Sequence, residues 1–250
     1  MPLDLISPNK RLTRIPGRGV QFLPGYPEPF KREIAAFLRT ASSARTIVEI
    51  GGGGLSFVLE IIDIPGVERI ICADPDFSSL NYHEIIQHYD LDRNYEEKID
   101  DKCILMKCNS ERFFELVESH PFIDAFVALR VAHFFSPDEF RHFLISAGSR
   151  IIKGGYMVLS GFGVTDHDNP EKLSEFYEHS HPISSQEHYR RLDENQPEAH
   201  ALMRDQNIQR DLLFFEERFI RTVTEQAGFR VVRGPERATR IVDGYIFQKL

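Results

Sequence analysis

Short apolar runs alternate with helical stretches along most of the chain, and this alternation constrains the fold more than any other feature. The expected strands are Thr46–Ile50, Arg69–Ala73, Cys103–Cys108, Phe122–Ala128 and Tyr156–Phe162. The expected helices between them are Leu55–Ile64, Phe77–Tyr89, a segment that contains Phe113–Val117, and one that begins after Ser136. A repeated strand–helix order predicts a parallel sheet with helices on both faces.

The helix after Ser136 has the clearest start signal. Ser136-Pro137-Asp138-Glu139 combines a capping serine, a proline in the first turn and a glutamate that completes a capping box. Behind this start, apolar residues fall on one helical face, and Gly154-Gly155 is expected to end the helix. The residues of that face are Phe140, Phe143, Leu144, Ala147 and Ile151.

The end of the chain departs from the strand–helix alternation. Leu212–Ala227 has the pattern of an amphipathic helix that Gly228 closes, and two strands, Phe229–Arg233 and Val242–Gln248, follow it. Residues 234–241 are too few for a parallel crossover, so the last two strands must be antiparallel. We therefore predict an α/β fold with a doubly wound, mostly parallel seven-stranded sheet that has one reversed strand at its end.

Composition narrows the class of protein. The chain has 250 residues, 42% hydrophobic and 27% charged, and no apolar run approaches the roughly 20 residues that span a bilayer. Because the N-terminus has no apolar leader, we expect a cytoplasmic protein. A net charge of −8 disfavours nucleic acid as a partner. Cys72, Cys103 and Cys108 fit reduced core thiols better than disulfides or a zinc site.

Residues 47–57, IVEIGGGGLSF, place Gly51–Gly54 directly after the first expected strand. Loops at the carboxyl edge of such a sheet bind ligands, and glycines there let a ligand approach the backbone. Asp74 ends the second strand, where a carboxylate accepts both hydroxyls of a ribose. The pair favours a nucleoside-containing cofactor; the alternative is a flexible turn, with Asp74 capping the next helix.

Two observations separate the classes of cofactor. A dinucleotide fingerprint needs a third glycine where this chain has Ser56 or Phe57. Glu49, just before the loop, disfavours a pyrophosphate and favours a cofactor that carries positive charge.

On these residues the sequence resembles the class I S-adenosylmethionine-dependent methyltransferase family, over about residues 28–163 and 210–250. The matching motifs are Glu49–Gly54, Asp74, Asn109-Ser110 after the third strand, IDAFVALRVAHFF at residues 123–135 and IIKGGYMVLS at residues 151–160. Two positions depart from the family pattern: Leu55 stands where another glycine is usual, and Asn109 replaces the usual carboxylate.

The resemblance implies S-adenosylmethionine as cofactor and a set of residue roles. The backbone at Gly51 and Gly53 would lie against the methionine and ribose parts, and Glu49 would meet the amino-acid end. Asp74 would bind the ribose hydroxyls. The adenine would be bordered by Asp76 and Phe77 and contacted by Asn109 and Ser110, with Leu129 and Arg130 near the sulfonium.

The segment after the fourth strand carries the candidate catalytic group. It lacks the Asp/Asn-Pro-Pro-aromatic motif of amino-methylating enzymes of this fold, and His133 is the best candidate for a general base. The alternative places His133 in an aromatic cluster with Phe134 and Phe135. Arg130 either steers an acidic substrate or pairs with a neighbouring carboxylate.

Two segments lie outside the expected core of the domain. An insert at about residues 164–209 is predicted to be a helical lid, with Ser184-x-x-Glu187 as a helix start and His167 and His179 near the substrate. A metal site from Asp166, His167, His179 and His181 is less favoured than solvated lid side chains, so we expect no metal. Residues 1–45 are predicted to form a strap and a helix, Glu28–Thr40, in which Tyr26 lines the pocket or only packs; residues 46–250 form the main domain.

The sequence thus predicts methyl transfer to a small-molecule acceptor, with an oxygen nucleophile favoured. Two alternatives stay open: an enzyme of the same fold with another nucleoside cofactor, and a binding or regulatory relative without catalysis. The methyl acceptor is not determined, and the oligomeric state, a homo-oligomer included, is left open.

Overall fold

The computed structural model describes most of the chain outside its N-terminus and the insert. The described residues are 29–41, 44–52, 55–75, 91–117, 120–129, 131–132, 135–162, 183–184, 213–215, 217–237 and 243–250. The predicted helix Phe77–Tyr89 lies outside them.

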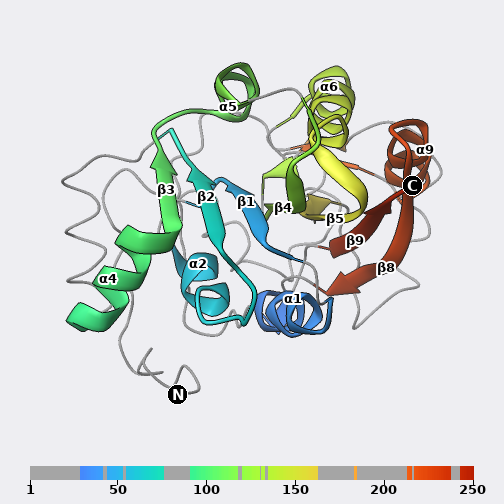
Figure 1. Ribbon diagram of the computed structural model, residues 1–250. Helices are drawn as coiled ribbons and strands as arrows, with labels where there is room; N and C mark the ends of the chain where they lie inside the picture. Colours follow the sequence, from blue (N-terminus) through green and yellow to red (C-terminus); the bar gives the residue numbers. More distant parts are fainter. Residues whose placement is uncertain are drawn as a thin grey trace, which may run out of the picture.

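A seven-stranded sheet forms the centre of the molecule (Figure 1). Its strands, in spatial order, are β3 (Cys103–Met106), β2 (Arg69–Ala73), β1 (Thr46–Ile50), β4 (Ile123–Ala128), β5 (Ile151–Phe162), β9 (Asp243–Lys249) and β8 (Phe229–Arg237). The pairs from β3 to β5 are parallel, and β9 is antiparallel to both β5 and β8. The predicted mixed sheet is confirmed, but the reversed strand is last in sequence and second from the edge in space.

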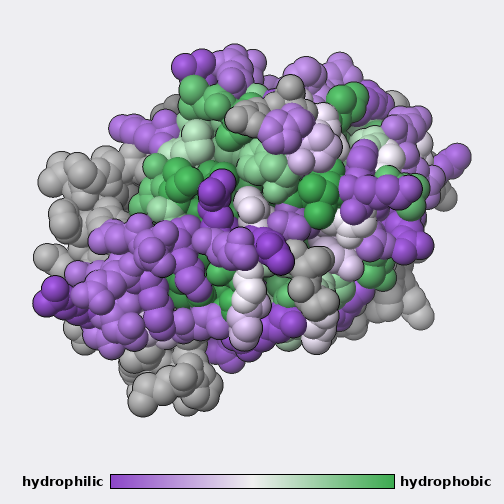
Figure 2. All heavy atoms as spheres, viewed as in Figure 1, coloured by the Kyte–Doolittle hydropathy of each residue, from purple (hydrophilic) through white to green (hydrophobic). Residues whose placement is uncertain are grey.

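Helices cover both faces of the sheet (Figure 1). The first face carries α1 (Pro29–Thr40), α2 (Ser56–Ile61) and α4 (Arg93–Lys102), and the second carries α5 (Ser110–Leu116), α6 (Pro137–Gly148) and α9 (Glu217–Gln226). The sequence did not predict α4, whose charged outer side leaves only Tyr95 and Ile99 buried. Figure 2 shows a hydrophilic surface over this helix.

Successive residues of each central strand point to opposite faces, which produces two separate cores. On β1, Ile47 joins the first core, between the sheet and α1 and α2, while Val48 joins the second, against α5 and α6. On β4, Val127 and Phe126 divide in the same way. Because both faces are buried, the register of every central strand is fixed by apolar packing.

Helix α6 begins as predicted and ends earlier than predicted. Its last residue is Gly148, and Ile151 is the first residue of β5 instead of part of the helical face. Gly154 and Gly155 therefore lie inside β5, where the register with β4 shifts. A Cβ at Gly155 would lie 2.9 Å from the Asp124 carbonyl oxygen. This glycine is therefore explained by the close approach of β4 to β5 and not, as predicted, by the end of a helix.

The predicted helix Leu212–Ala227 is shorter in the structure. It begins at Glu217, while Leu213–Phe214 form β7, which pairs with β6 (Ile183–Ser184). Ser184, predicted to start a helix, is thus a strand residue, and the rest of the predicted lid lies outside the described residues. Gly228 does close α9, with φ +82°. Helix α2 is also shorter than predicted: it ends at Ile61, whereas the sequence predicted an end at Ile64.

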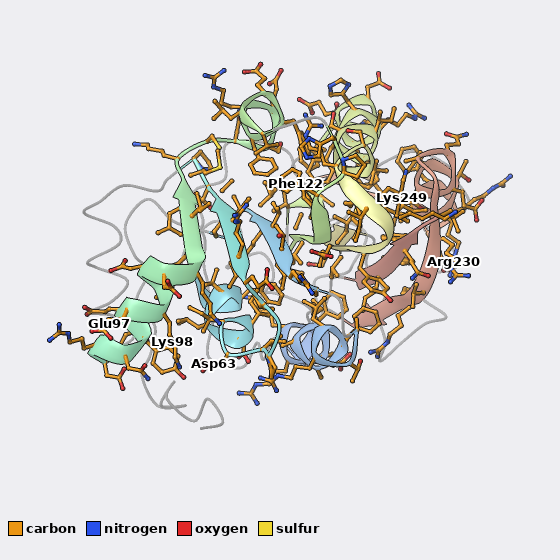
Figure 3. All side chains as sticks on the ribbon, in the orientation of Figure 1. Asp63, Glu97, Lys98, Phe122, Arg230 and Lys249 are labelled. Atoms are coloured by element: carbon orange, nitrogen blue, oxygen red, sulfur yellow. The ribbon has the colours of Figure 1, made fainter. Side chains whose placement is uncertain are left out.

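Cationic side chains bind the carbonyl ends of several helices. Lys102 donates to Ile62 O (3.0 Å) after α2, and Arg150 donates to Ser146 O (2.8 Å) in α6. Lys249, labelled in Figure 3, donates to Ala227 O (2.9 Å) after α9. A positive charge at a helix C-terminus offsets the helix dipole and pairs carbonyls that would otherwise lack a donor. Within the described part of the chain, no helix is long and apolar enough to cross a membrane.

Replacing Ser136 with alanine should lower the free energy of unfolding by about 1 kcal/mol, because the side chain caps α6. Ser136 Oγ accepts from the Glu139 amide, and the Glu139 carboxylate accepts from the Ser136 amide (2.7 Å). Urea denaturation followed by circular dichroism measures the change. Thr222→Ala, which removes an exposed hydroxyl inside α9, is the control and should be nearly neutral. Equal effects of the two variants would contradict a capping role.

Candidate active site at the carboxyl edge of the sheet

The loop after β1 begins at the edge where β1 and β2 end together. Parallel pairing places Glu49 opposite Cys72 and Ile50 opposite Ala73. The Gly51 amide then donates to the Ala73 carbonyl (2.8 Å), so the ladder runs one residue beyond β1. Asp74 follows directly on β2, and its amide donates to Met106 O of β3 (3.0 Å). The glycine loop and Asp74 therefore lie at neighbouring strand ends.

The protein's own atoms explain the first two glycines of the loop. Gly51 has φ +77°, and a Cβ there would lie 2.6 Å from Val131 Cγ2, which follows β4. A Cβ on Gly52 would lie 2.7 Å from Glu49 Oε2 and closer still to Cys72 Sγ. Neither position has room for a side chain. Gly53 and Gly54 lie outside the described residues.

Leu55 keeps the backbone conformation that glycine usually supplies at this point of the resembled family. Its φ is 57° and its ψ is 12°, in the left-handed region, immediately before α2. Its amide donates to Gly52 O (2.7 Å), which closes the turn. The side chain is fully buried in the first core, on the α2 side of the sheet. The missing glycine therefore places an apolar side chain in the core and leaves the turn intact.

Two carboxylates are buried at this edge. Glu49 is 4% exposed and Asp74 is 8% exposed. Glu49 Oε2 accepts from the Cys72 thiol, with Sγ 3.4 Å away. Burial raises the pKa of Cys72 well above its usual value, and the charges of Glu49 and Asp74 raise it further, so this thiol is a protonated donor at neutral pH. The strand ends thus offer concentrated negative charge in a site of low dielectric constant.

Asn109, predicted to contact an adenine, caps α5. Its Oδ1 accepts from the Arg112 amide (2.9 Å), and Ser110 is the first residue of the helix. The capping preference of asparagine was a signal in the sequence that could have revealed this role. Asn109 is exposed and comes shortly after β3, whose last residue, Met106, accepts from the Asp74 amide.

Two residues that follow β4 closely in the sequence, Leu129 and Ala132, are buried in the two cores. Leu129 is 9% exposed in the first core, and Ala132 is buried in the second. Phe135 packs on Phe143 of α6, with ring centroids 4.9 Å apart. Between these anchors, Val131 lies against Gly51, which brings the β4 loop beside the glycine loop.

Several predicted site residues lie outside the described residues. They are Tyr26, Gly53, Asp76, Phe77, Arg130, His133, His167 and His179. In the part of the chain that the structure describes, no group of three or more histidine, cysteine, aspartate or glutamate side chains is placed to hold a metal ion.

Comparison with known proteins rests on structure alone. No protein-family model matches the sequence, and no curated protein matches it either. Solved structures do match. An O-methyltransferase family protein from Burkholderia thailandensis superposes with a TM-score of 0.57 at 17% identity, over 88% of this chain. The fold is the class I methyltransferase fold.

Two further structures with this fold were solved with a bound ligand. The 1,6-didemethyltoxoflavin-N1-methyltransferase of Burkholderia thailandensis, solved with S-adenosylhomocysteine, gives a TM-score of 0.54 at 12% identity over 89% of this chain and 79% of that protein. The magnesium protoporphyrin IX methyltransferase of Synechocystis PCC 6803, also solved with S-adenosylhomocysteine, gives 0.55 at 12% identity over 89% of this chain and 83% of that protein. By contrast, the chain spans 55% of the O-methyltransferase family protein.

At position 55 the usual stability order of alanine and glycine should be reversed. Leu55→Ala should lose about 2–5 kcal/mol of unfolding free energy, because a buried side chain is removed. Leu55→Gly should be more stable than Leu55→Ala by about 1 kcal/mol, because only glycine adopts positive φ without strain. Urea denaturation measures both values.

The matched control for this comparison is Ile145, which is 62% exposed on α6. There, alanine should be more stable than glycine by about 1 kcal/mol, the ordinary helix preference. If alanine also exceeds glycine at position 55, the left-handed turn is not the conformation of the protein in solution.

Proposed function

We propose that this protein binds S-adenosylmethionine and transfers its methyl group to a small-molecule acceptor, with an oxygen nucleophile favoured. The observation that carries the proposal is the pair of buried carboxylates, Glu49 and Asp74, on either side of a glycine turn at the carboxyl ends of β1 and β2. The solved structures with S-adenosylhomocysteine or S-adenosylmethionine bound support the choice of cofactor.

The charges of the site fit this cofactor. S-Adenosylmethionine carries a sulfonium and an ammonium, and two buried carboxylates attract such a ligand strongly where water is excluded. Asp74 would accept hydrogen bonds from both ribose hydroxyls, and Glu49 would meet the ammonium, directly or through a water molecule. A phosphate-bearing cofactor would meet the same two carboxylates with repulsion. This contrast favours the methyl donor over a dinucleotide.

The adenine would lie toward β3. Because Asn109 Oδ1 is occupied in capping α5, its Nδ2 group is the part that would donate to a ring nitrogen of adenine. Ser110 would contribute its backbone amide at the start of α5. Asp76 and Phe77, which follow Asp74, would border the opposite edge of the base.

The acceptor would bind beyond the loop after β4. When bound, the cofactor would supply an electrophilic methyl group for in-line attack by the acceptor's lone pair, with S-adenosylhomocysteine as the leaving thioether. Leu129 and Arg130 would lie beside the sulfonium, and His133 would take the proton that an oxygen nucleophile loses. Holding the acceptor in line can lower the barrier of such a reaction by several kcal/mol, up to about 7–11 kcal/mol.

The two flanking segments would enclose the acceptor. Strand β5, which precedes the insert of residues 164–209 in the sequence, contacts β7, which follows it. We propose that it covers the carboxyl edge and places His167 and His179 near the acceptor. Residues before α1, with Tyr26, would close the opposite side.

A protein that binds the cofactor without catalysis is the second candidate. Asn109 in the place of a carboxylate favours it, since the adenine amino group loses a charged acceptor. Leu55 argues for neither candidate, because its side chain lies in the first core and leaves the turn unchanged.

Calorimetric titration with S-adenosylhomocysteine tests the binding site. Wild-type protein should bind, and Asp74→Asn should weaken binding about 10-fold to 100-fold, since each hydrogen bond to a charged group contributes about 1.5–3 kcal/mol. Asp101→Asn, which changes an exposed carboxylate on α4, is the matched control and should bind normally. Unchanged affinity in the Asp74 variant would refute the placement of the ribose.

Transfer of labelled methyl groups to a panel of phenols, catechols, carboxylic acids and amines tests catalysis. With the best acceptor, His133→Ala should lower kcat by about 10²–10⁴-fold and leave S-adenosylhomocysteine affinity unchanged, as expected for a general base. His142→Ala on the exposed side of α6 is the control. Tight cofactor binding without transfer to any acceptor in the panel would favour the second candidate.

A further inference from the structure

The Glu49 carboxylate accepts a hydrogen bond from a cysteine on the neighbouring strand. The β1–β2 register places Glu49 opposite Cys72, with both side chains on the α2 side of the sheet. Cys72 is 0% exposed and Glu49 is 4% exposed, and Sγ lies 3.4 Å from Oε2. A sulfur donor at this distance is within hydrogen-bond reach of the carboxylate.

Gly52 is packed onto this pair. A side chain there would lie 2.7 Å from Glu49 Oε2, 2.9 Å from Glu49 Cδ and closer still to Cys72 Sγ. The backbone of the glycine loop therefore lies directly against the thiol and the carboxylate. With β2 on one side and Gly52 above, Glu49 has little room to adopt another rotamer.

The thiol can act only as a donor in this position. Burial, then the charges of Glu49 and Asp74, keep the pKa of Cys72 well above its usual value. A protonated thiol stabilises the ionised carboxylate through a weak S–H···O hydrogen bond, and it is not a nucleophile. Because Glu49 is buried, each hydrogen bond that its carboxylate accepts helps to offset the cost of burying it.

We propose that Cys72 is a positioning residue: its thiol holds Glu49 beneath Gly52 in the orientation that receives the amino-acid end of the cofactor. This inference rests on the proposed function, and it assigns the thiol to one part of the ligand. The adenosine part is bound by Asp74 and the β3 edge, which Cys72 does not hydrogen-bond. Cys72 therefore sets how strongly the site prefers a nucleoside that carries an amino-acid chain.

Two ligands separate this role from a general effect on the fold. S-Adenosylhomocysteine has the amino-acid chain, and 5′-methylthioadenosine is an adenosine thioether without it. Calorimetry gives the affinity of each ligand for wild-type protein and for Cys72→Ala, Cys72→Val and Cys72→Ser. Alanine and valine both remove the donor, alanine with a loss of side-chain volume and valine with a gain, and serine keeps a donor.

The donor-less variants should bind S-adenosylhomocysteine about threefold to tenfold more weakly, the loss expected for one modest hydrogen bond. Their affinity for 5′-methylthioadenosine should stay within about twofold of the wild type. Cys72→Ser should retain the wild-type ratio of the two affinities. Cys108→Ala is the matched control, because Cys108 is also a buried thiol but belongs to the second core.

Each outcome is decisive. Equal weakening of both ligands in the alanine and valine variants would overturn the inference, because it would make Cys72 a structural residue only. Wild-type affinity for both ligands in the alanine and valine variants would overturn the inference too. Either result, alongside normal binding by the wild type, would leave the proposed function standing. Wild-type protein that binds neither ligand would instead refute the proposed function, and the inference with it.

Discussion

Parallel pairing between β1 and β2 is the constraint on which the rest of the site depends. Their register carries the ladder to the hydrogen bond between the Gly51 amide and the Ala73 carbonyl, so the glycine loop leaves one strand where Asp74 leaves the next. A shift of one residue would turn every side chain of β1 to the other face, and Glu49 would enter the aromatic second core. The two apolar cores prevent such a shift, so core packing positions the polar groups.

The site concentrates negative charge where burial makes charge expensive. Glu49 and Asp74 are both nearly inaccessible to solvent, and the Cys72 thiol cannot ionise to add a third negative charge. Burying charge is costly unless it is paired, and the cationic cofactor that we propose would supply such a pair. The amino edge of the sheet shows the opposite design, because lysine and arginine side chains there bind the ends of helices.

The glycine run shows how one pattern can have several physical causes. The sequence suggested that a ligand needs these glycines, and at Gly51 and Gly52 the structure shows that the neighbouring Val131, Glu49 and Cys72 need them already. Leu55 shows the converse, since a non-glycine residue keeps the left-handed turn because its side chain gains full burial. The effect of replacing a motif glycine, as at Leu55, therefore depends on where the new side chain lies.

Local signals in the sequence determined the order of the seven strands of the central sheet along the chain, the Ser136 capping box and the antiparallel pairing of the last two strands. These depend on residues that are close together in the sequence. Tertiary structure alone decided that Gly155 lies inside β5, that the Cys72 thiol meets Glu49 and that Leu55 points into the core. Those facts depend on which distant segments pack together, and side-chain contacts across strands leave no periodic trace in the sequence.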